Sequence, residues 1–365
     1  MTLVTLLLLV GGLALLFVGG ELLVRGSTRL AAAAGISPLI VGLTVVAFGT
    51  SAPEFAVSVQ AGLAGQSDIS VGNVVGSNIG NVLFILGIAA LITPLAVAQN
   101  MVRRDVPLMI AASAGLWVMA LDGMVSRLEG FMLFAGIVAY TVYAIREGRR
   151  ESAAVRNEYE AAFGAERKPA MRESALNLAL VAGGIGLLVI GAGWLVDGAV
   201  VIARWLGLSE LIIGLTIVAI GTSLPELATS VIAAIRGQRD IAVGNIVGSN
   251  LFNILGVLGL TAIVAPAGVA VPQVALNFDI PVMTAVAVAC LPVFFSGYQI
   301  SRWEGGLFLA YYIAYAAYLV LGAADHDALP IFSAAMLGFV IPLTTVTLAV
   351  VVVRGMRSAR RASAG

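Results

Sequence analysis

The sequence predicts an all-α integral membrane protein, and three observations support this fold class. The chain of 365 residues is 60% hydrophobic and 11% charged, and its mean hydropathy of +1.03 lies far above that of soluble globular proteins. Apolar stretches of about 20 residues, the length of helix that crosses about 30 Å of hydrocarbon, recur along the whole sequence. Alternating patterns of about 10 residues, which would indicate a membrane β-barrel, do not recur.

Eleven membrane-spanning helices are predicted from these stretches. The first five lie near residues 3–24, 36–62, 70–94, 106–121 and 128–145. The other six lie near residues 174–203, 209–235, 242–265, 277–297, 304–322 and 330–353. With the N-terminus outside, eighteen of the 20 Lys and Arg residues fall in the inner loops and the tail, and only Arg127 and Arg204 fall outside. This distribution follows the positive-inside rule and predicts an N-out, C-in topology.

A long internal repeat divides the chain into two halves. The segment 42–87, GLTVVAFGTSAPEFAVSVQAGLAGQSDISVGNVVGSNIGNVLFILG, returns at 214–259 as GLTIVAIGTSLPELATSVIAAIRGQRDIAVGNIVGSNLFNILGVLG. The offset is 172 residues without a gap, and about 30 of the 51 positions from 42 to 92 are identical in the second copy. Shared hydrophobicity alone would not produce this identity, so the two halves are duplicates.

The predicted helices place the second copy in the opposite orientation across the membrane. Five spans separate a position in one copy from its mate, and because five is odd, the second copy enters from the other side. Inverted repeats with interrupted helices are typical of secondary transporters. The predicted organisation is a first five-helix repeat at 1–145, a charged cytoplasmic linker at 146–173, a second five-helix repeat at 174–322, and an additional helix at 330–353 followed by a basic cytoplasmic tail to residue 365.

Each copy carries a proline followed by a glutamate inside its apolar run. Pro53 and Pro225 have no amide hydrogen and clash with the preceding turn, so each is expected to open its helix and free the carbonyl oxygens just before it. Glu54 and Glu226 follow directly, and a carboxylate at this depth is costly enough to predict a functional role. No basic residue lies in a core span of either repeat to pair with them. The sequence therefore favours a cation site over a buried ion pair.

The next helix of each copy adds a stripe of polar side chains on one face. The members recur every four residues and are Asn73, Ser77 and Asn81 in the first copy, and Asn245, Ser249 and Asn253 in the second. Ser77, Asn81, Ser249 and Asn253 are predicted to bind cations. For Asn73, Asn78, Asn245 and Asn250, cation binding and hydrogen bonding that only joins helices both remain open. Thr50 and Thr222 precede the glutamates by four residues and can share their helix face.

The chemistry of these groups predicts which ions they hold. Carboxylates, amide oxygens, hydroxyls and freed carbonyls are hard ligands that suit Ca²⁺, and by the same oxygen preference Na⁺, whereas Zn²⁺ or Cu²⁺ would favour nitrogen or sulfur. Two glutamates supply a charge of −2, which balances one Ca²⁺ or most of the charge of several Na⁺. The two loads can therefore compete for overlapping positions, and protons can compete for the carboxylates as well.

A second pair of duplicated acidic residues receives a structural interpretation. Asp105 and Asp279 recur as DVP and DIP at the start of corresponding spans. An aspartate followed two residues later by a proline is common at a helix entry, so these residues are expected to be helix caps.

These motifs resemble the two α-repeats of the cation/Ca²⁺ exchanger superfamily, and are close to those of prokaryotic Na⁺/Ca²⁺ exchangers. The matching residues are GTSAPE with VGNVVGSNIGN, and GTSLPE with VGNIVGSNLFN, and the resemblance covers the first ten spans. It implies that Glu54 and Glu226 are the central ligands. By the same resemblance the surrounding ligands are Thr50, Ser51, Ser77, Asn81, Thr222, Ser223, Ser249 and Asn253, with backbone carbonyls of Ala47, Thr50, Ala219 and Thr222.

The leading functional hypothesis is an electrogenic Na⁺/Ca²⁺ antiporter that extrudes Ca²⁺ across the plasma (inner) membrane of a prokaryote. A Ca²⁺/H⁺ antiporter on the same scaffold is the alternative, because a carboxylate can exchange Ca²⁺ for either ion. A channel would repeat its filter around an axis rather than invert it, and no motif of a hydrolytic enzyme is present. Besides Ca²⁺, Na⁺ and the lipid bilayer, no cofactor and no nucleic-acid partner is expected.

Overall fold

The computed structural model confirms the helical membrane fold. It describes residues 3–34, 37–163, 171–205, 219–324, 326–347 and 349. Within these ranges nine helices are long and apolar enough to cross a membrane, or ten when a bent pair is counted as one span. The seventh predicted span, 209–235, begins in residues outside the described ranges, and its second part is helix α12 (Leu224–Ile235). The count of eleven spans remains a prediction.

The first repeat consists of helices interrupted by short π-helical segments. Its elements in chain order are α1 (Leu3–Ala34), α2 (Pro38–Val41), η1 (Gly42–Val46), α3 (Ala47–Thr50), α4 (Ala52–Leu63), α5 (Ser67–Gly80), η2 (Asn81–Leu86), α6 (Gly87–Ile92), β1 (Leu95–Ala96), η3 (Met101–Asp105), α7 (Val106–Met119), η4 (Ala120–Asp122), β2 (Met124–Val125) and α8 (Arg127–Phe163). Such π-helical turns are common at functional sites because they redirect side chains within a helix.

The second repeat follows the same order of elements. These are α9 (Met171–Trp205), α11 (Ala219–Gly221), α12 (Leu224–Ile235), α13 (Arg239–Leu251), η6 (Phe252–Leu258), α14 (Gly259–Val264), β3 (Val269–Ala270), η7 (Ala275–Asp279), α15 (Ile280–Phe295), β4 (Gln299–Ile300) and α16 (Arg302–Ala323). An additional helix follows as α17 (Leu329–Ala335) and η8 (Met336–Val340). The π-helical segments η2 and η6 occupy matching places, and each contains the last residue of the polar stripe predicted for its repeat, Asn81 or Asn253.

Two short antiparallel ribbons join the repeats and show their inverted relation. Strand β1 pairs with β4, and β2 pairs with β3. Strands β1 and β3 occupy matching places in the two repeats. Strand β3 pairs with β2, and β2 lies at the opposite end of α7 from β1. The matching strands therefore lie at opposite ends of the molecule, as an inverted repeat requires.

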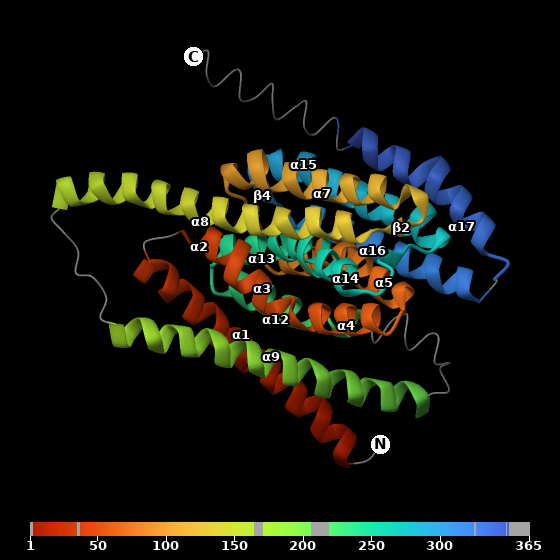
Figure 1. Cartoon of the computed structure of the whole chain (residues 1–365), viewed down its shortest axis with the longest axis horizontal. Coiled ribbons are helices and arrows are strands. Elements are labelled where there is room, and N and C mark those ends of the chain that lie inside the picture. Colours follow the sequence, from red (N-terminus) through yellow and green to blue (C-terminus); the bar gives the residue numbers. More distant parts are fainter. Residues whose placement is uncertain are drawn as a thin grey trace.

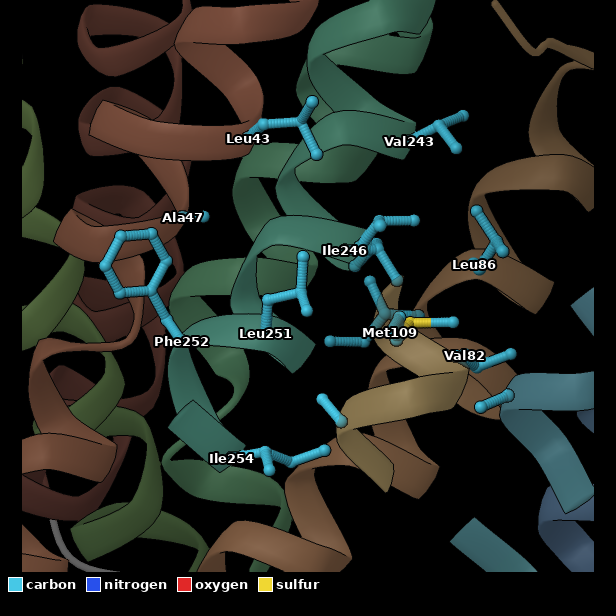
Figure 2. Packing of buried hydrophobic residues seen from close by; sticks show 14 of the residues in the cluster. Leu43, Ala47, Val82, Leu86, Met109, Val243, Ile246, Leu251, Phe252 and Ile254 are labelled. Carbon is cyan, nitrogen blue, oxygen red and sulfur yellow. The ribbon is translucent and has the colours of Figure 1, made fainter. Parts of the chain in front are cut away.

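The polar-stripe helices form the centre of the molecule. In the span Arg239–Val264, 89% of an 18-residue apolar stretch is buried inside the protein. The corresponding share is 67% in Ser67–Ile92 and 28% in Leu3–Ala31. In Figure 1, α13, α3 and α5 lie in the middle, with α7, α8 and α15 on one side and the crossing helices α1 and α9 on the other. Figure 2 shows the apolar packing around this centre, where Leu43, Met109 and Ile246 come from three different helices.

The part of the predicted linker (146–173) that the structure describes is helical, because α8 continues to Phe163 and α9 begins at Met171. Its place on the cytoplasmic side remains a prediction. One sequence-based expectation is wrong. Asp105 and Asp279 are not side-chain caps. Their helices begin earlier, with η3 and η7, so no free helix start exists at either aspartate. Instead, Asp105 accepts a hydrogen bond of 3.2 Å from Tyr140, and Asp279 accepts one of 2.9 Å from Tyr315.

The additional helix packs on the outside of the second repeat. The candidate span covers Leu329–Thr347, and no part of its 18-residue apolar stretch is buried inside the protein. Tyr311 of α16 donates its hydroxyl hydrogen to Thr344 at 2.7 Å, and the same hydroxyl lies 3.3 Å from the carbonyl oxygen of Val340. A helix is thus present where the eleventh span was expected, and its crossing of the membrane remains a prediction.

Candidate cation site

The predicted helix break lies at Ser51. The segments Leu39–Thr50 and Ala52–Leu63 are bent by 48° to one another. Pro53, in the first turn of α4, has no amide hydrogen for the carbonyl of Gly49, so the helix cannot continue straight. In the second repeat α11 ends at Gly221 and α12 begins at Leu224, and the intervening Ser223 has nearly the same backbone angles as Ser51.

Both glutamates of the duplicated motif are completely buried at these breaks. Glu54 and Glu226 are each 0% exposed and lie in the first turns of α4 and α12. In the described part of the chain, the arginines that form ion pairs contact Glu21 or Glu147, and neither buried glutamate has a basic partner. An unpaired buried carboxylate is unfavourable, which makes a bound cation the natural partner.

Serines from both repeats hold each carboxylate. Ser223 donates to Oε1 of Glu54 at 3.1 Å, and Ser51 donates to Oε1 of Glu226 at 3.0 Å, so each of these bonds crosses from one repeat to the other. Within the repeats, Ser77 donates to Glu54 at 3.5 Å and Ser249 to Glu226 at 3.4 Å. All four serines use the same carboxylate oxygen of their glutamate, and the second oxygen of each remains available.

The two threonines contact the first asparagine of the opposite stripe. Thr50 donates to Oδ1 of Asn245 at 3.1 Å, and Thr222 donates to Oδ1 of Asn73 at 3.3 Å. The amide nitrogens of these asparagines donate in turn to Ser230 at 3.0 Å and Ser58 at 2.9 Å. In Asn73 and Asn245, therefore, both the amide oxygen and the amide nitrogen have a hydrogen-bond partner. This favours the interhelical role that the sequence left open for Asn73 and Asn245.

The backbone ligands implied by the resemblance are only partly described. The carbonyl of Ala47 accepts a hydrogen bond from the amide of Ser51 at 3.0 Å and one from the hydroxyl of Thr50 at 3.4 Å. Ala219 is the first residue of α11, directly after residues 206–218, which lie outside the described ranges. Ser58 and Ser230 were missed at the sequence level, although their offset of 172 residues marks them as mates.

Among the described residues, eight buried side-chain oxygens have no hydrogen-bond partner, and the four that belong to charged or amide side chains of predicted cation ligands form two matched pairs. They are Oε2 of Glu54, Oε2 of Glu226, Oδ1 of Asn81 and Oδ1 of Asn253. The great majority of buried polar atoms in proteins have a partner, so unsatisfied atoms in two matched pairs indicate a missing ligand. All four are hard acceptors, and the described residues contain no cluster of three His, Cys, Asp or Glu. The arrangement fits a cation that prefers oxygen ligands.

These features define a class of protein. Two inverted copies of a broken helix that meet at a buried, oxygen-lined site form the architecture of secondary transporters. Comparison with protein families then identifies the family, because the chain matches the model of the sodium/calcium exchanger protein family over residues 4–146 and 176–321. The chain belongs to this family, which consists of transporters and not of enzymes.

Individual relatives are similar over most of their length. The chain is 41% identical to the putative antiporter CaxA of Alkalimonas amylolytica, with 83% of this chain and 95% of the relative covered. It is 34% identical to the sodium/calcium exchanger MaX1 of Methanosarcina acetivorans, with 87% and 98% covered. Among solved structures, the sodium-calcium exchanger NCX_Mj is 31% identical with a TM-score of 0.75, with 87% of this chain and 99% of NCX_Mj covered.

Proposed function

We propose that this chain exchanges Na⁺ for Ca²⁺ and uses the inward Na⁺ gradient to extrude Ca²⁺ across the plasma membrane of a prokaryote. Antiport of cations including Ca²⁺ follows from the family, and the choice of the coupling ion is the proposed step. The observation that supports a cation site is the group of four unsatisfied oxygens around two carboxylates that have no basic partner among the described residues. The choice of Na⁺ as the coupling ion is supported by the names of two relatives. Their charge of −2 matches one Ca²⁺ and can be neutralised equally by Na⁺.

The proposed ligands are the residues predicted from the sequence. Glu54 and Glu226 supply the charge, and Asn81 and Asn253 supply neutral oxygens. The proposed set also includes six hydroxyls: those of Thr50, Ser51, Ser77, Thr222, Ser223 and Ser249. The carbonyls of Ala47 and Ala219 complete the proposed set. Hydroxyls that now donate to the carboxylates can rotate and offer a lone pair to a cation.

The names of two relatives support Na⁺ coupling. MaX1 is named a sodium/calcium exchanger, and NCX_Mj has been solved in crystals soaked with Na⁺ together with Ca²⁺ or Sr²⁺. The relative CaxA is named only as a putative antiporter, so a Ca²⁺/H⁺ antiporter stays the second candidate. Its supporting observation is the pair of buried carboxylates that no basic residue of the described ranges contacts, because such groups can also take up protons.

A transport assay separates the two candidates. Purified protein is reconstituted into liposomes loaded with Na⁺ and diluted into Na⁺-free buffer at fixed pH, and radioactive Ca²⁺ uptake is followed. We expect uptake that requires internal Na⁺ and disappears in Glu54→Gln and Glu226→Gln. Glu147→Gln serves as the control, since Glu147 pairs with Arg104 away from the site. Uptake that ignores Na⁺ and follows an imposed pH gradient would establish the proton-coupled alternative.

A further inference from the structure

Asn78 and Asn250 form a reciprocal network between the two repeats. They are 2% and 3% exposed and lie on α5 and α13. Asn253 donates its amide hydrogen to Oδ1 of Asn78 at 3.2 Å, and Asn81 donates to Oδ1 of Asn250 at 3.0 Å. Each of the two asparagines therefore contacts a proposed cation ligand that belongs to the other repeat.

The surroundings of Asn78 fix the direction of its amide. Its nitrogen lies 3.4 Å from the carbonyl oxygen of Asn250 and 3.5 Å from the sulfur of Met283. Both neighbours can only accept hydrogen bonds, so the nitrogen must face them and the oxygen must face Asn253. Asn250 repeats this arrangement with the carbonyl of Asn78 at 3.4 Å and the sulfur of Met109 at 3.5 Å.

The orientation of the Asn78 and Asn250 amides fixes the orientation of the proposed ligands Asn253 and Asn81. Because Asn78 presents an oxygen to Asn253, Asn253 must turn its nitrogen toward Asn78, and its own oxygen then faces away and remains unsatisfied within the described part of the chain. Asn253 lies one helical turn from Ser249, which contacts Glu226. Released from Asn78, its amide would gain a stronger hydrogen bond by turning its nitrogen toward a carboxylate. That rotation would remove an oxygen ligand and place a donor against the cation.

We propose that Asn78 and Asn250 are positioning residues that hold the amide oxygens of Asn253 and Asn81 toward the bound cation. The inference rests on the proposed function and deepens it. Each repeat orients a ligand of its mate, so the affinity of the site depends on contact between the repeats. Met283 and Met109 belong to the same hydrogen-bond network. Their sulfur atoms accept hydrogen bonds from the amides of Asn78 and Asn250 and cannot donate one.

The test measures the KM and the maximal rate of Ca²⁺ uptake in proteoliposomes. In Asn78→Leu and Asn250→Leu the orienting oxygen is lost at similar side-chain volume. We expect the KM for Ca²⁺ to rise by about tenfold or more, because the ligand now prefers the wrong rotamer, while the maximal rate per folded protein changes less. A purely structural role would lower the amount of active protein and leave KM unchanged. Thr261→Val, which removes a buried bond to the carbonyl of Val257 one turn earlier at similar side-chain volume, is the control.

A second comparison, made in the Asn253→Asp protein, separates the loss of ligand orientation from a general loss of folded structure. Asn253→Asp replaces the amide by a carboxylate whose two oxygens are equivalent, so no orientation is needed. In this background, adding Asn78→Leu should change KM by less than about twofold. If the leucine variants fail to yield monodisperse protein, Asn78→Ala and Asn250→Ala carry the same comparison.

Three results would contradict the inference in different ways. An unchanged KM in both single variants overturns the positioning role while leaving Na⁺/Ca²⁺ exchange intact. If Asn78→Leu raises KM equally in the wild-type and Asn253→Asp backgrounds, orientation is not what Asn78 supplies. A wild-type protein that takes up Ca²⁺ under neither a Na⁺ nor a pH gradient overturns the proposed function itself, and the inference with it.

Discussion

Ser51 of the first repeat donates its hydroxyl hydrogen to Glu226 of the second at 3.0 Å, and Ser223 returns the same contact to Glu54 at 3.1 Å. Each carboxylate is thus held by the helix break of the opposite copy. The bond is possible because the break ends the preceding helix and leaves the serine at the junction, where its side chain can reach across. The site therefore forms only when both repeats are folded against each other.

Removing either serine should weaken cation binding. We expect Ser51→Ala and Ser223→Ala each to lower Ca²⁺ affinity about tenfold, or about 1.4 kcal/mol, because the cation loses the oxygen of a proposed hydroxyl ligand. The two variants should have similar effects because their contacts are equivalent. Isothermal titration of purified protein with Ca²⁺ measures this, with Thr261→Val as control. Wild-type affinity in both variants would show that these contacts are not part of the site.

The positions of the duplicated residues could largely be predicted from the sequence because the same pattern occurs in both copies, and their role as a cation site remains a prediction. Glu54 with Glu226, and the broken helices before them, could be placed from the repeat and from the chemistry of proline. The orientation of Asn81 and Asn253 could not, because it depends on acceptors supplied by distant segments, such as the sulfur of Met283.

The role of the duplicated aspartates was also not predictable. Asp105 was expected to be a cap from its position before a proline, but the helix starts one π-helical turn earlier and Tyr140 becomes its partner. Local sequence gives no sign of this tertiary contact. The charged residues of the predicted linker signal the end of the membrane and not the end of the helix, so α8 continues to Phe163.

The crossing of α1 and α9 should be sensitive to a single methyl group. A Cβ atom at Gly184 would lie 2.7 Å from the backbone nitrogen of Leu23 and 2.8 Å from the carbonyl oxygen of Gly19, so two helix backbones would have to separate. We expect Gly184→Ala to destabilise the protein by about 1–3 kcal/mol. Gly186→Ala, on the same helix with nothing within 4 Å, should be neutral or stabilising by up to about 1 kcal/mol. Thermal unfolding in detergent compares them, and equal Tm values would contradict the close contact.

An ion pair without a symmetry mate links α1 to the end of α12. Arg236 contacts both carboxylate oxygens of Glu21 at 2.9 Å, and Arg25 contacts the same carboxylate. The equivalent positions of the inverted copy are Gly193 and Ala64, which cannot form such a pair. The interaction therefore stabilises one arrangement of the repeats and has no counterpart in the inverted one.

A double-mutant cycle measures this link. Because the Arg236 side chain is 50% exposed, the coupling should be modest, about 0.5–1 kcal/mol. Glu21→Gln and Arg236→Gln should each lower Tm slightly, and the double variant should lower it by less than the sum of the two. The coupling should shrink at about 1 M salt, where screening is strong. Additive effects at low salt would mean that the pair contributes nothing to stability.

The additional helix should be dispensable for exchange. Both repeats are complete before it, and its apolar side chains point outward, with Ile331 75% exposed and Leu337 69% exposed, as expected for contact with lipid. Its described polar anchor is Tyr311 of α16, far in the chain from the glutamates. We expect a variant that ends at Ala324 to keep the wild-type KM for Ca²⁺ uptake while its Tm falls, and Tyr311→Phe to lower Tm by a smaller amount. Because truncation leaves every proposed ligand in place, a well-folded truncated protein that no longer transports Ca²⁺ would assign this helix to the moving parts of the transporter.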